Sequence, residues 1–254
     1  SGHPKVTANV PAVGHSADDI LRLAGTLERS SQHPLGLAIV SAAEAKGLTL
    51  GKAQNFDAPI GKGVTGSLEG KQLIIGNQRI MTEAGIDVSA LTAKAEELRN
   101  DGATVIFMAA DGAPAGLFAI ADPVKTTTPK AVKGLAADGV RVVMLTGDNK
   151  TTAEAVARKL GITDVEAEVL PEEKSAIVTR LREEGRIVAM AGDGVNDAPA
   201  LAAADVGIAM GTGTDVAIES AGVTLLRGDL QGIDRARKLS AATMKNIRQN
   251  LFFA

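Results

Sequence analysis

The residues best suited to chemistry in this sequence are two aspartates, Asp193 and Asp197, in the stretch GDGVND. The glycines on either side of Asp193 let the backbone come close to a bound group without a clash at Cβ. Two carboxylates at one point suit Mg2+, which completes its octahedron with water and phosphate oxygens. A turn aspartate followed by a helix-capping aspartate is the ordinary explanation when this spacing stands alone.

A second acidic turn in the sequence favours the Mg2+ site over this ordinary explanation. Thr146, Gly147 and Asp148 follow the apolar run RVVML and precede a predicted helix. The Thr146 hydroxyl can donate to a phosphate oxygen, and Gly147 frees a backbone N–H for another. Lys174 lies near the start of a helix between the two turns, where its charge opposes the helix dipole and requires a carboxylate or phosphate partner. A solvated lysine is the alternative for Lys174 alone, but together these groups indicate a phosphoryl site.

The elements that must position these groups alternate between strand and helix after Asp122. We predict helices at residues 128–137, 152–160, 172–183, 198–203 and 216–221, and strands at residues 140–145, 165–169, 187–190, 206–209 and 223–226. This order predicts an α/β fold with a doubly wound parallel sheet, whose ligand sites lie at the carboxyl ends of strands. Residues 229–254 are predicted to form one long helix, basic at first and apolar at its end.

The chain before Asp122 has a different character. Helices are predicted at residues 16–29, 34–46, 78–83 and 89–100, and strands at residues 64–68, 72–75, 104–108 and 116–120. Glu69-Gly70 and Asp111-Gly112 are typical of hairpin turns. This is an α+β layout with an antiparallel sheet, so we place a domain boundary at residues 121–123.

Composition limits the function classes. The net charge of -3 and the aromatic content of 2% give no reason to expect a nucleic-acid partner. The absence of cysteine excludes disulfides and cysteine metal sites within these residues and fits a reducing compartment. No apolar run reaches about 18 residues, so we expect no membrane-spanning helix in this stretch.

A hydroxyl turn, a lysine and paired aspartates, in this order, resemble the later motifs of the haloacid dehalogenase-like phosphotransferases. Residues 144–149 and 189–221 resemble one branch of them, the P-type cation-transporting ATPases. The resemblance implies a phosphorylation domain of residues 1–7 and 122–254, with a nucleotide-binding domain of residues 8–121 inserted in it. It also implies that Thr146, Gly147, Asp148 and Lys174 form the catalytic site, and that Asp193, Asn196 and Asp197 hold Mg2+.

Short pieces of the first part are similar to the nucleotide-binding domain of heavy-metal P-type ATPases. The residues that carry this similarity are Gln32, His33, Gly61, Gly63, Val64, Gly76 and Asn77. Adenine is a flat ring that requires a close backbone wall, which glycine permits, and a polar group to orient it, such as His33. Each piece alone is explained by a turn or a helix start, but together they predict an ATP site. Gln32 stands where the family usually has glutamate, and its amide keeps an acceptor.

The family's phosphorylated aspartate belongs to a DKTGT motif, which does not occur in these 254 residues. The residues that follow Ser1 resemble the segment after this motif, so we expect the nucleophile to lie a few residues upstream of Ser1. We then expect the chain to bind nucleotide without turnover. The resemblance implies transmembrane and actuator domains as partners and a place at the cytoplasmic face of a membrane.

Residues 244–254 resemble the copper-transporting members more than the zinc or cadmium ones, which favours Cu(I) export. Two other functions remain open. A free-standing haloacid dehalogenase-like phosphatase would need its own nucleophilic aspartate at a strand end. A catalytically silent nucleotide-binding module would need none.

Overall fold

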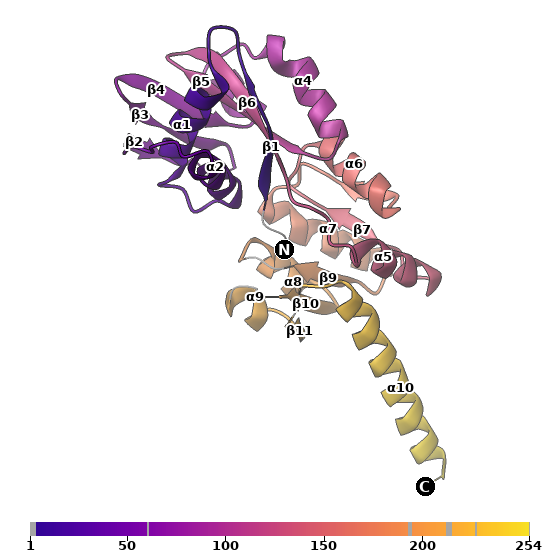
Figure 1. Cartoon of the computed structure of the whole chain (residues 1–254). Helices are drawn as coiled ribbons and strands as arrows, with labels where there is room; N and C mark the ends of the chain where they lie inside the picture. The colour runs from indigo at the N-terminus through magenta and orange to yellow at the C-terminus, as the bar shows by residue number, and fades with distance from the viewer. Residues whose placement is uncertain (1–3, 60, 193–194, 212–214, 227, 254) are drawn as a thin grey trace. The chain divides into compact units, whose positions relative to one another are not determined.

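The computed structural model describes residues 4–59, 61–192, 195–211, 215–226 and 228–253. It divides into two compact units (Figure 1). The first unit runs to Pro123 and also contains Asn149–Val156, whereas the second contains Val124–Asp148 and the chain from Ala157 onward.

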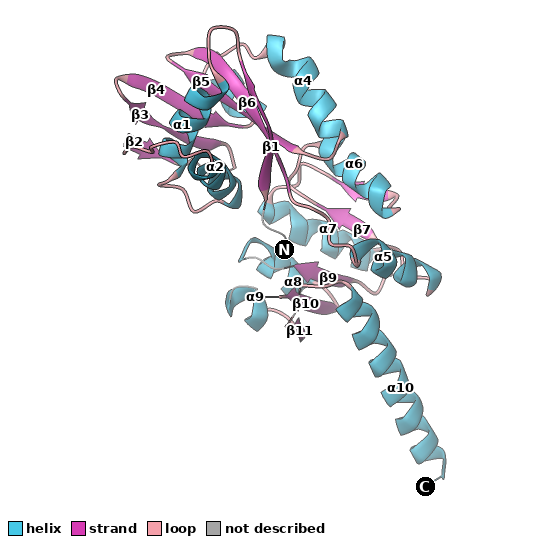
Figure 2. Ribbon diagram, in the orientation of Figure 1, coloured by secondary structure: helices cyan, strands magenta, loops and turns pink. Residues whose placement is uncertain are grey.

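The first unit is built on a six-stranded antiparallel sheet in the order β1-β6-β5-β4-β3-β2 (Figure 2). Its strands are β1 (Lys5–Pro11), β2 (Gln54–Asp57), β3 (Gly63–Leu68), β4 (Lys71–Gly76), β5 (Thr104–Ala110) and β6 (Ala113–Ala121). Its helices are α1 (Ala17–Glu28), α2 (Pro34–Ala45), α3 (Gln78–Glu83) and α4 (Ser89–Asn100). The antiparallel α+β layout expected for this part is confirmed.

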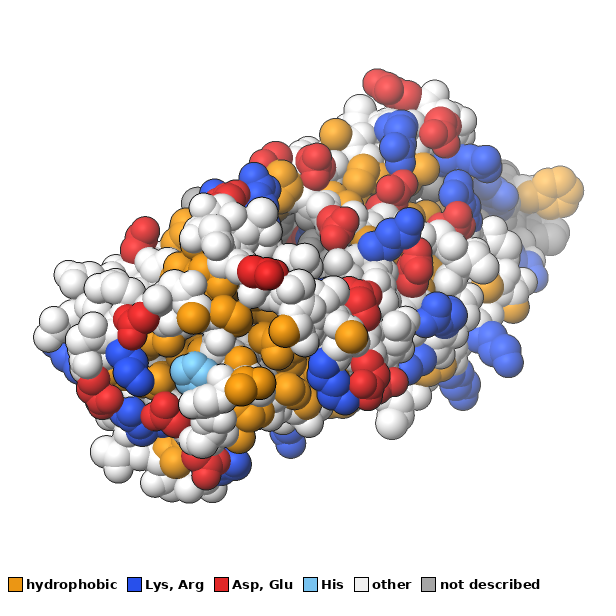
Figure 3. All heavy atoms as spheres, turned by 90° about the horizontal axis from the view of Figure 1, so that it is seen from above, with side chains coloured by type: hydrophobic (Ala, Val, Ile, Leu, Met, Phe, Trp, Pro, Cys, Tyr) orange, Lys and Arg blue, Asp and Glu red, His pale blue; other side chains and the backbone are white. Residues whose placement is uncertain are grey.

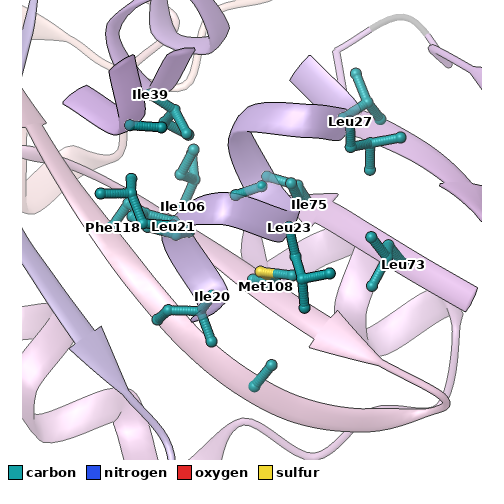
Figure 4. Packing of buried hydrophobic residues seen from close by; sticks show 14 of the residues in the cluster. Ile20, Leu21, Leu23, Leu27, Ile39, Leu73, Ile75, Ile106, Met108 and Phe118 are labelled. Carbon is teal, nitrogen blue, oxygen red and sulfur yellow. The ribbon is translucent and has the colours of Figure 1, made fainter. Parts of the chain in front are cut away.

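Each face of this sheet has its own hydrophobic cluster, because successive strand residues point to opposite sides. On β5, Ile106 and Met108 pack with α1 and α2, together with Leu23 and Ile39 (Figure 4). The intervening Phe107 packs on the other face, against residues of α3 and α4. The sheet is therefore the middle layer of three.

Both predicted hairpin turns are present. Glu69 and Gly70 have φ values of 53° and 81°, and Asp111 and Gly112 have values of 51° and 78°. Two consecutive residues with positive φ match the right-handed twist of the flanking strands, and this is why Asp-Gly and similar pairs are favoured there.

Two edge strands lie where the sequence predicted none. β1 and β2 are short of large apolar residues, and each pairs on one side only, β1 with β6 and β2 with β3. A strand that buries little carries little alternation for a sequence pattern to detect. In β1, Lys5 lies opposite Ala121 and Val6 opposite Ile120, so both residues pair with β6, although the family resemblance assigns them to the domain of residues 122–254.

The second unit alternates strands and helices as expected. Its strands are β7 (Val143–Leu145), β8 (Asp164–Glu166), β9 (Ala189–Gly192), β10 (Val206–Met210) and β11 (Val223–Leu225). Its helical elements are α5 (Thr128–Ala137), α7 (Pro171–Glu183), the 3-10 turn η1 (Val195–Asp197), α8 (Ala198–Ala203), α9 (Asp215–Glu219) and α10 (Gln231–Phe253), with the end of α6 (Lys150–Leu160). All strand pairs described in this unit are parallel, in one ladder of β11-β10-β9 and another of β7-β8.

Helix α6 begins in the first unit. The Thr151 hydroxyl donates to Glu96 Oε2 of α4 (3.0 Å), and the buried Thr152 hydroxyl donates to the carbonyl of Ala103 (2.9 Å). These bonds explain why residues 149–156 group with the first sheet, whereas the sequence placed them with residues 122–254.

The surface offers no strong single-sign field on the face seen in Figure 3, where basic and acidic side chains are interspersed. Within the described ranges, no helix is both long and apolar enough to cross a membrane.

Candidate functional site

The turn after β7 is held together by its own hydroxyl. The Thr146 N–H extends the parallel ladder by donating to the carbonyl of Glu166 (3.0 Å). The Thr146 hydroxyl donates to Asp148 Oδ2 (2.9 Å) and accepts the Asp148 N–H (3.1 Å). Gly147, between them, is exposed. A phosphate oxygen bound here would replace the Asp148 carboxylate as the acceptor of the Thr146 hydroxyl.

The loop that leads into α7 is fastened to this turn. The Glu168 N–H donates to the carbonyl of Asp148 (2.9 Å), and the Val169 N–H donates to the carbonyl of Thr146 (3.1 Å). Glu168 has a φ of 57°, a left-handed conformation that costs a non-glycine residue about 1–2 kcal/mol. The loop therefore places the first turn of α7 next to the Thr146–Asp148 turn.

Lys174, in that first turn, has the partner that its position required. Its Nζ lies 2.7 Å from Asp197 Oδ1, and the two side chains are only 17% and 13% exposed. Asp197 ends η1 and lies against the end of β9, where a Cβ on Gly192 would come within 2.8 Å of Asp197 Oδ2. Gly192 is thus the glycine that admits the Asp197 side chain.

The predicted Mg2+ ligands are only partly visible. Asp193 lies outside the described residues, Asn196 is exposed, and Asp197 is engaged with Lys174. In the described part of the chain, no group of three acidic or histidine side chains could hold a metal ion. The side chains of Asn196 and Asp197 are oxygen donors of the kind that Mg2+ prefers, so the donor set fits this ion.

The start of the chain bears on the expected phosphorylated aspartate. Ser1, upstream of which the sequence places that aspartate, lies outside the described residues, as do Gly2 and His3. The described chain begins at Pro4 and enters β1 at Lys5. The nucleophile upstream of Ser1 therefore stays a prediction.

His33 caps α2 in the first unit. Its ring Nδ1 accepts the Leu35 N–H (3.2 Å), and its backbone N–H donates to the Ser31 hydroxyl (3.1 Å). The neutral ring therefore carries its proton on Nε2. Partial burial lowers the pKa of His33, because desolvation disfavours the imidazolium. Both His33 and its neighbour Gln32 are exposed to solvent, so the neutral ring can meet a ligand.

The glycines predicted to lie against adenine are of two kinds. Gly63 and Gly76 lie opposite each other in the β3–β4 ladder. A Cβ on Gly63 would lie 2.0 Å from the carbonyl oxygen of Ile75, and one on Gly76 would lie 2.2 Å from that of Lys62. Both are required by backbone packing. Gly61, with a φ of 72°, has nothing within 4 Å of the Cβ position, so it is the glycine whose missing side chain leaves open space.

Asn77 fixes the loop that carries Gly61. Its Nδ2 donates to the Gly61 carbonyl (3.0 Å), and its backbone N–H donates to the carbonyl of Lys62 (3.1 Å). Its Oδ1 accepts the Ile80 N–H (3.1 Å) and so caps α3. The structure thus brings Gly61, Gly63, Gly76 and Asn77 together at one end of the β3–β4 hairpin.

The end of α1 lies on the same side of the sheet as Val64. Val64 is buried, 5% exposed, in the cluster that contains Leu27 of α1 and Ile39 of α2. A Cβ on Gly66 would lie 2.7 Å from Leu27 Cδ1. The α1–α2 connection that carries His33 therefore joins two helices that pack on the face of the sheet to which Val64 of β3 points.

Glu28, the last residue of α1, is a candidate that the sequence prediction missed. It is 5% exposed, and its Oε2 has no hydrogen-bond partner among the described residues. Burial raises the pKa of Glu28, and a hydrogen bond with Ser31 lowers it in part. A Cβ on Gly36 would lie 2.3 Å from Glu28 Oε2, so Gly36 makes room for the carboxyl group. A glutamate at the end of an apolar helix, shortly before His33, was the available signal.

The sequence of the chain is similar to those of known P-type ATPases. The chain is 59% identical over 253 residues to a silver exporting P-type ATPase of Salmonella typhimurium and covers 31% of that protein. It is also 59% identical over 253 residues to a copper-exporting P-type ATPase of Legionella pneumophila, of which it covers 34%. All of this chain is matched in both comparisons, and it spans about a third of each relative's length.

A solved structure of the catalytic domain of a CPx-ATPase, described for its conformational changes upon nucleotide binding, is similar with a TM-score of 0.69 and 28% identity. The similarity covers 91% of this chain and 81% of that one. The matched region is the catalytic-domain region of heavy-metal P-type ATPases. A family model described as haloacid dehalogenase-like hydrolase matches residues 1–205, and the chain belongs to that family.

Proposed function

We propose that the chain is the ATP-binding and phosphorylation portion of a P-type ATPase that exports a heavy-metal ion. The observation that carries this proposal is the ion pair between Lys174 and Asp197 at the carboxyl end of β9. Lys174 belongs to α7, and the loop that leads into α7 is hydrogen-bonded to the Thr146–Asp148 turn. A cation in the first turn of α7, and a hydroxyl and a backbone N–H in the turn after β7, are what a phosphoryl group requires, because its transfer is catalysed by positioning and charge neutralisation.

In the phosphoryl site, Lys174, Thr146 and Gly147 would hold the phosphoryl oxygens, and Asp148 would orient the Thr146 hydroxyl. Asp193 with Asn196 would hold Mg2+, which neutralises the charge that develops on the oxygens. Asp197 would act chiefly by holding Lys174, since a lysine in the first turn of a helix is otherwise pushed away by the dipole.

In the nucleotide site, adenine would lie between Glu28, His33 and the open space at Gly61, with Gln32 at its edge. A protonated Glu28 has one donor and one acceptor, which match the ring nitrogen and the amino group on one edge of adenine. The raised pKa of Glu28 favours that neutral form. The neutral His33 ring would stack on the base or donate from Nε2.

For the whole protein, we propose Cu(I) export driven by an aspartyl phosphate, with transmembrane and actuator domains as partners and this portion at the cytoplasmic face. The copper-exporting relative supports this metal. The silver exporting relative makes Ag(I), another soft monovalent cation, the second candidate. Since these 254 residues contain no DKTGT, the chain by itself would bind nucleotide without turnover.

Titration calorimetry of the chain with ATP and ADP tests the nucleotide site. We expect binding by the wild type and a loss of about tenfold or more in His33→Ala and Glu28→Ala, because each removes a group worth roughly 1–3 kcal/mol in a partly buried site. Glu28→Gln should bind well, since an amide also presents a donor and an acceptor. His15→Ala is the matched control. Equal affinity in wild type and His33→Ala would remove His33 from the site, and no binding by the wild type would refute the proposal.

A further inference from the structure

A cationic cluster lies on the loop that carries Gly61 and is not used by the adenine site. Lys62 Nζ lies 2.7 Å from Glu83 Oε2, and Arg79 Nε lies 3.0 Å from Glu83 Oε1. The side chains of Lys62, Glu83 and Arg79 are 34%, 43% and 66% exposed. One carboxylate thus serves two cations, and the cluster keeps a net charge of +1.

The fold fixes this cluster beside the proposed nucleotide site. Lys62 stands between Gly61 and Gly63, and its carbonyl accepts the Asn77 N–H. Arg79 and Glu83 lie one turn apart on α3, the helix that Asn77 caps. Asn77 therefore holds both the loop and the helix, so the backbone positions of Lys62 and of α3 are tied to that of Gly61.

The ion pairs of Glu83 are weak enough for another anion to replace its carboxylate. Exposed ion pairs contribute about 0–1 kcal/mol each, so little holds Glu83 between the two cations. A polyphosphate carries more charge than a carboxylate and offers several acceptors, and both lysine and arginine bind phosphate through charge-assisted hydrogen bonds. A nucleotide with its base at Gly61 could therefore replace Glu83 as the partner of Lys62 and Arg79.

We propose that Lys62 and Arg79 bind the phosphate tail of the nucleotide, and that Glu83 is the counter-ion that the tail displaces. This inference rests on the proposed nucleotide site and adds its selectivity: the affinity rises from adenosine through AMP and ADP to ATP. Binding of ATP also weakens with ionic strength, because the added contacts are between exposed charges.

Substitution of Lys62 tests the inference. In the 254-residue chain, Lys62→Gln should lower the affinity for ATP by about two- to fivefold, the effect of losing one exposed charged contact. It should leave the affinity for adenosine, followed by NMR titration, unchanged. Glu83→Gln should raise the affinity for ATP, because it removes the competing carboxylate. Lys71→Gln is the matched control, since Lys71 lies opposite Leu68 at the far end of the same ladder and carries the same charge.

The outcomes separate this inference from the proposed function. Equal ATP affinities in wild type, Lys62→Gln and Lys71→Gln, with adenosine still bound, would overturn the phosphate role and keep the adenine site. A wild-type chain that binds neither adenosine nor ATP would refute the nucleotide site itself, and the inference with it. A loss of ATP affinity in Lys71→Gln equal to that in Lys62→Gln would show a general field effect and overturn the assignment to Lys62.

Discussion

At the scale of single residues, the proposed nucleotide site contains two titratable groups whose pKa values move in opposite directions for one reason. Desolvation raises the pKa of Glu28 and lowers the pKa of His33, so both favour their neutral forms. A site that holds an uncharged acid and an uncharged imidazole suits a neutral base such as adenine. The charged contacts to phosphate groups would come instead from Lys62, in the loop that carries Gly61, and from Lys174, the partner of Asp197.

Glu28 should make stability depend on pH in an unusual direction. A carboxyl group whose pKa is raised by folding contributes stability that is fully present below its unfolded value, about 4.3, and is lost as the pH rises through the folded value. Glu28→Gln should therefore be more stable than the wild type at pH 7, by about 1–3 kcal/mol from the burial of an unpaired charge. The difference should shrink towards pH 4.

Urea unfolding of both chains between pH 4 and pH 8 measures this difference. Glu44→Gln, which changes an exposed glutamate of α2, is the control for the loss of one negative charge. A constant difference between wild type and Glu28→Gln across this range would show that Glu28 is not perturbed by burial.

At the scale of elements, the β3–β4 hairpin separates the glycines that backbone packing requires from a glycine that borders open space. Gly63 and Gly76 let two backbones approach more closely than any side chain would allow, because a Cβ there would lie 2.0 Å and 2.2 Å from the facing carbonyl oxygens. Gly61 lies just outside the ladder and borders open space. Asn77 connects the two kinds by bonding to Gly61 and Lys62.

Gly63→Ala and Gly61→Ala should separate folding from binding. Both glycines have positive φ, so alanine costs about 1–3 kcal/mol of backbone strain at either position. Only Gly63→Ala adds a backbone clash, and it should destabilise the chain by roughly 3 kcal/mol or more. Gly61→Ala should instead weaken nucleotide binding, because its methyl group enters the open space. Thermal unfolding and calorimetry on both variants decide this, and equal unfolding midpoints would contradict the packing role of Gly63.

At the scale of the whole molecule, the chain consists of two compact units with different architectures. The first has a sheet with a hydrophobic cluster on each face. The second has two parallel ladders, and Asp205, next to β10, accepts the Val188 N–H (2.9 Å) before β9 and an N–H of Arg182 in α7 (3.0 Å). Nucleotide and phosphoryl groups would thus be recognised by parts with different architectures.

Calorimetry should accordingly resolve two unfolding transitions. ATP at about 100 times its Kd should stabilise the first unit by about 2.7 kcal/mol through mass action and leave the other transition in place. Asp205→Asn should lower only the transition that ATP does not shift, since it removes an acceptor between α7, β9 and β10. A single transition that responds to both changes would show that the units unfold together.

Sequence alone determined the elements with strong local signals. The sequence predicted the helices α3, α4, α5 and α8 with their observed bounds, and the Asp-Gly turn at residues 111–112 was predicted because its backbone needs positive φ. Lys174 was predicted to need a partner because of the helix dipole. These features depend on a few neighbouring residues, so a sequence carries them directly.

Only the tertiary structure decided features that join distant residues. In the tertiary structure, β1 pairs with β6, Lys174 forms an ion pair with Asp197, and the buried Glu28 carboxyl group lies against Gly36. The tertiary structure also separated Gly63, which is required for packing, from Gly61, which is not. Burial and pairing are set by which surfaces meet across the chain, and no local pattern specifies the partner that a side chain will find.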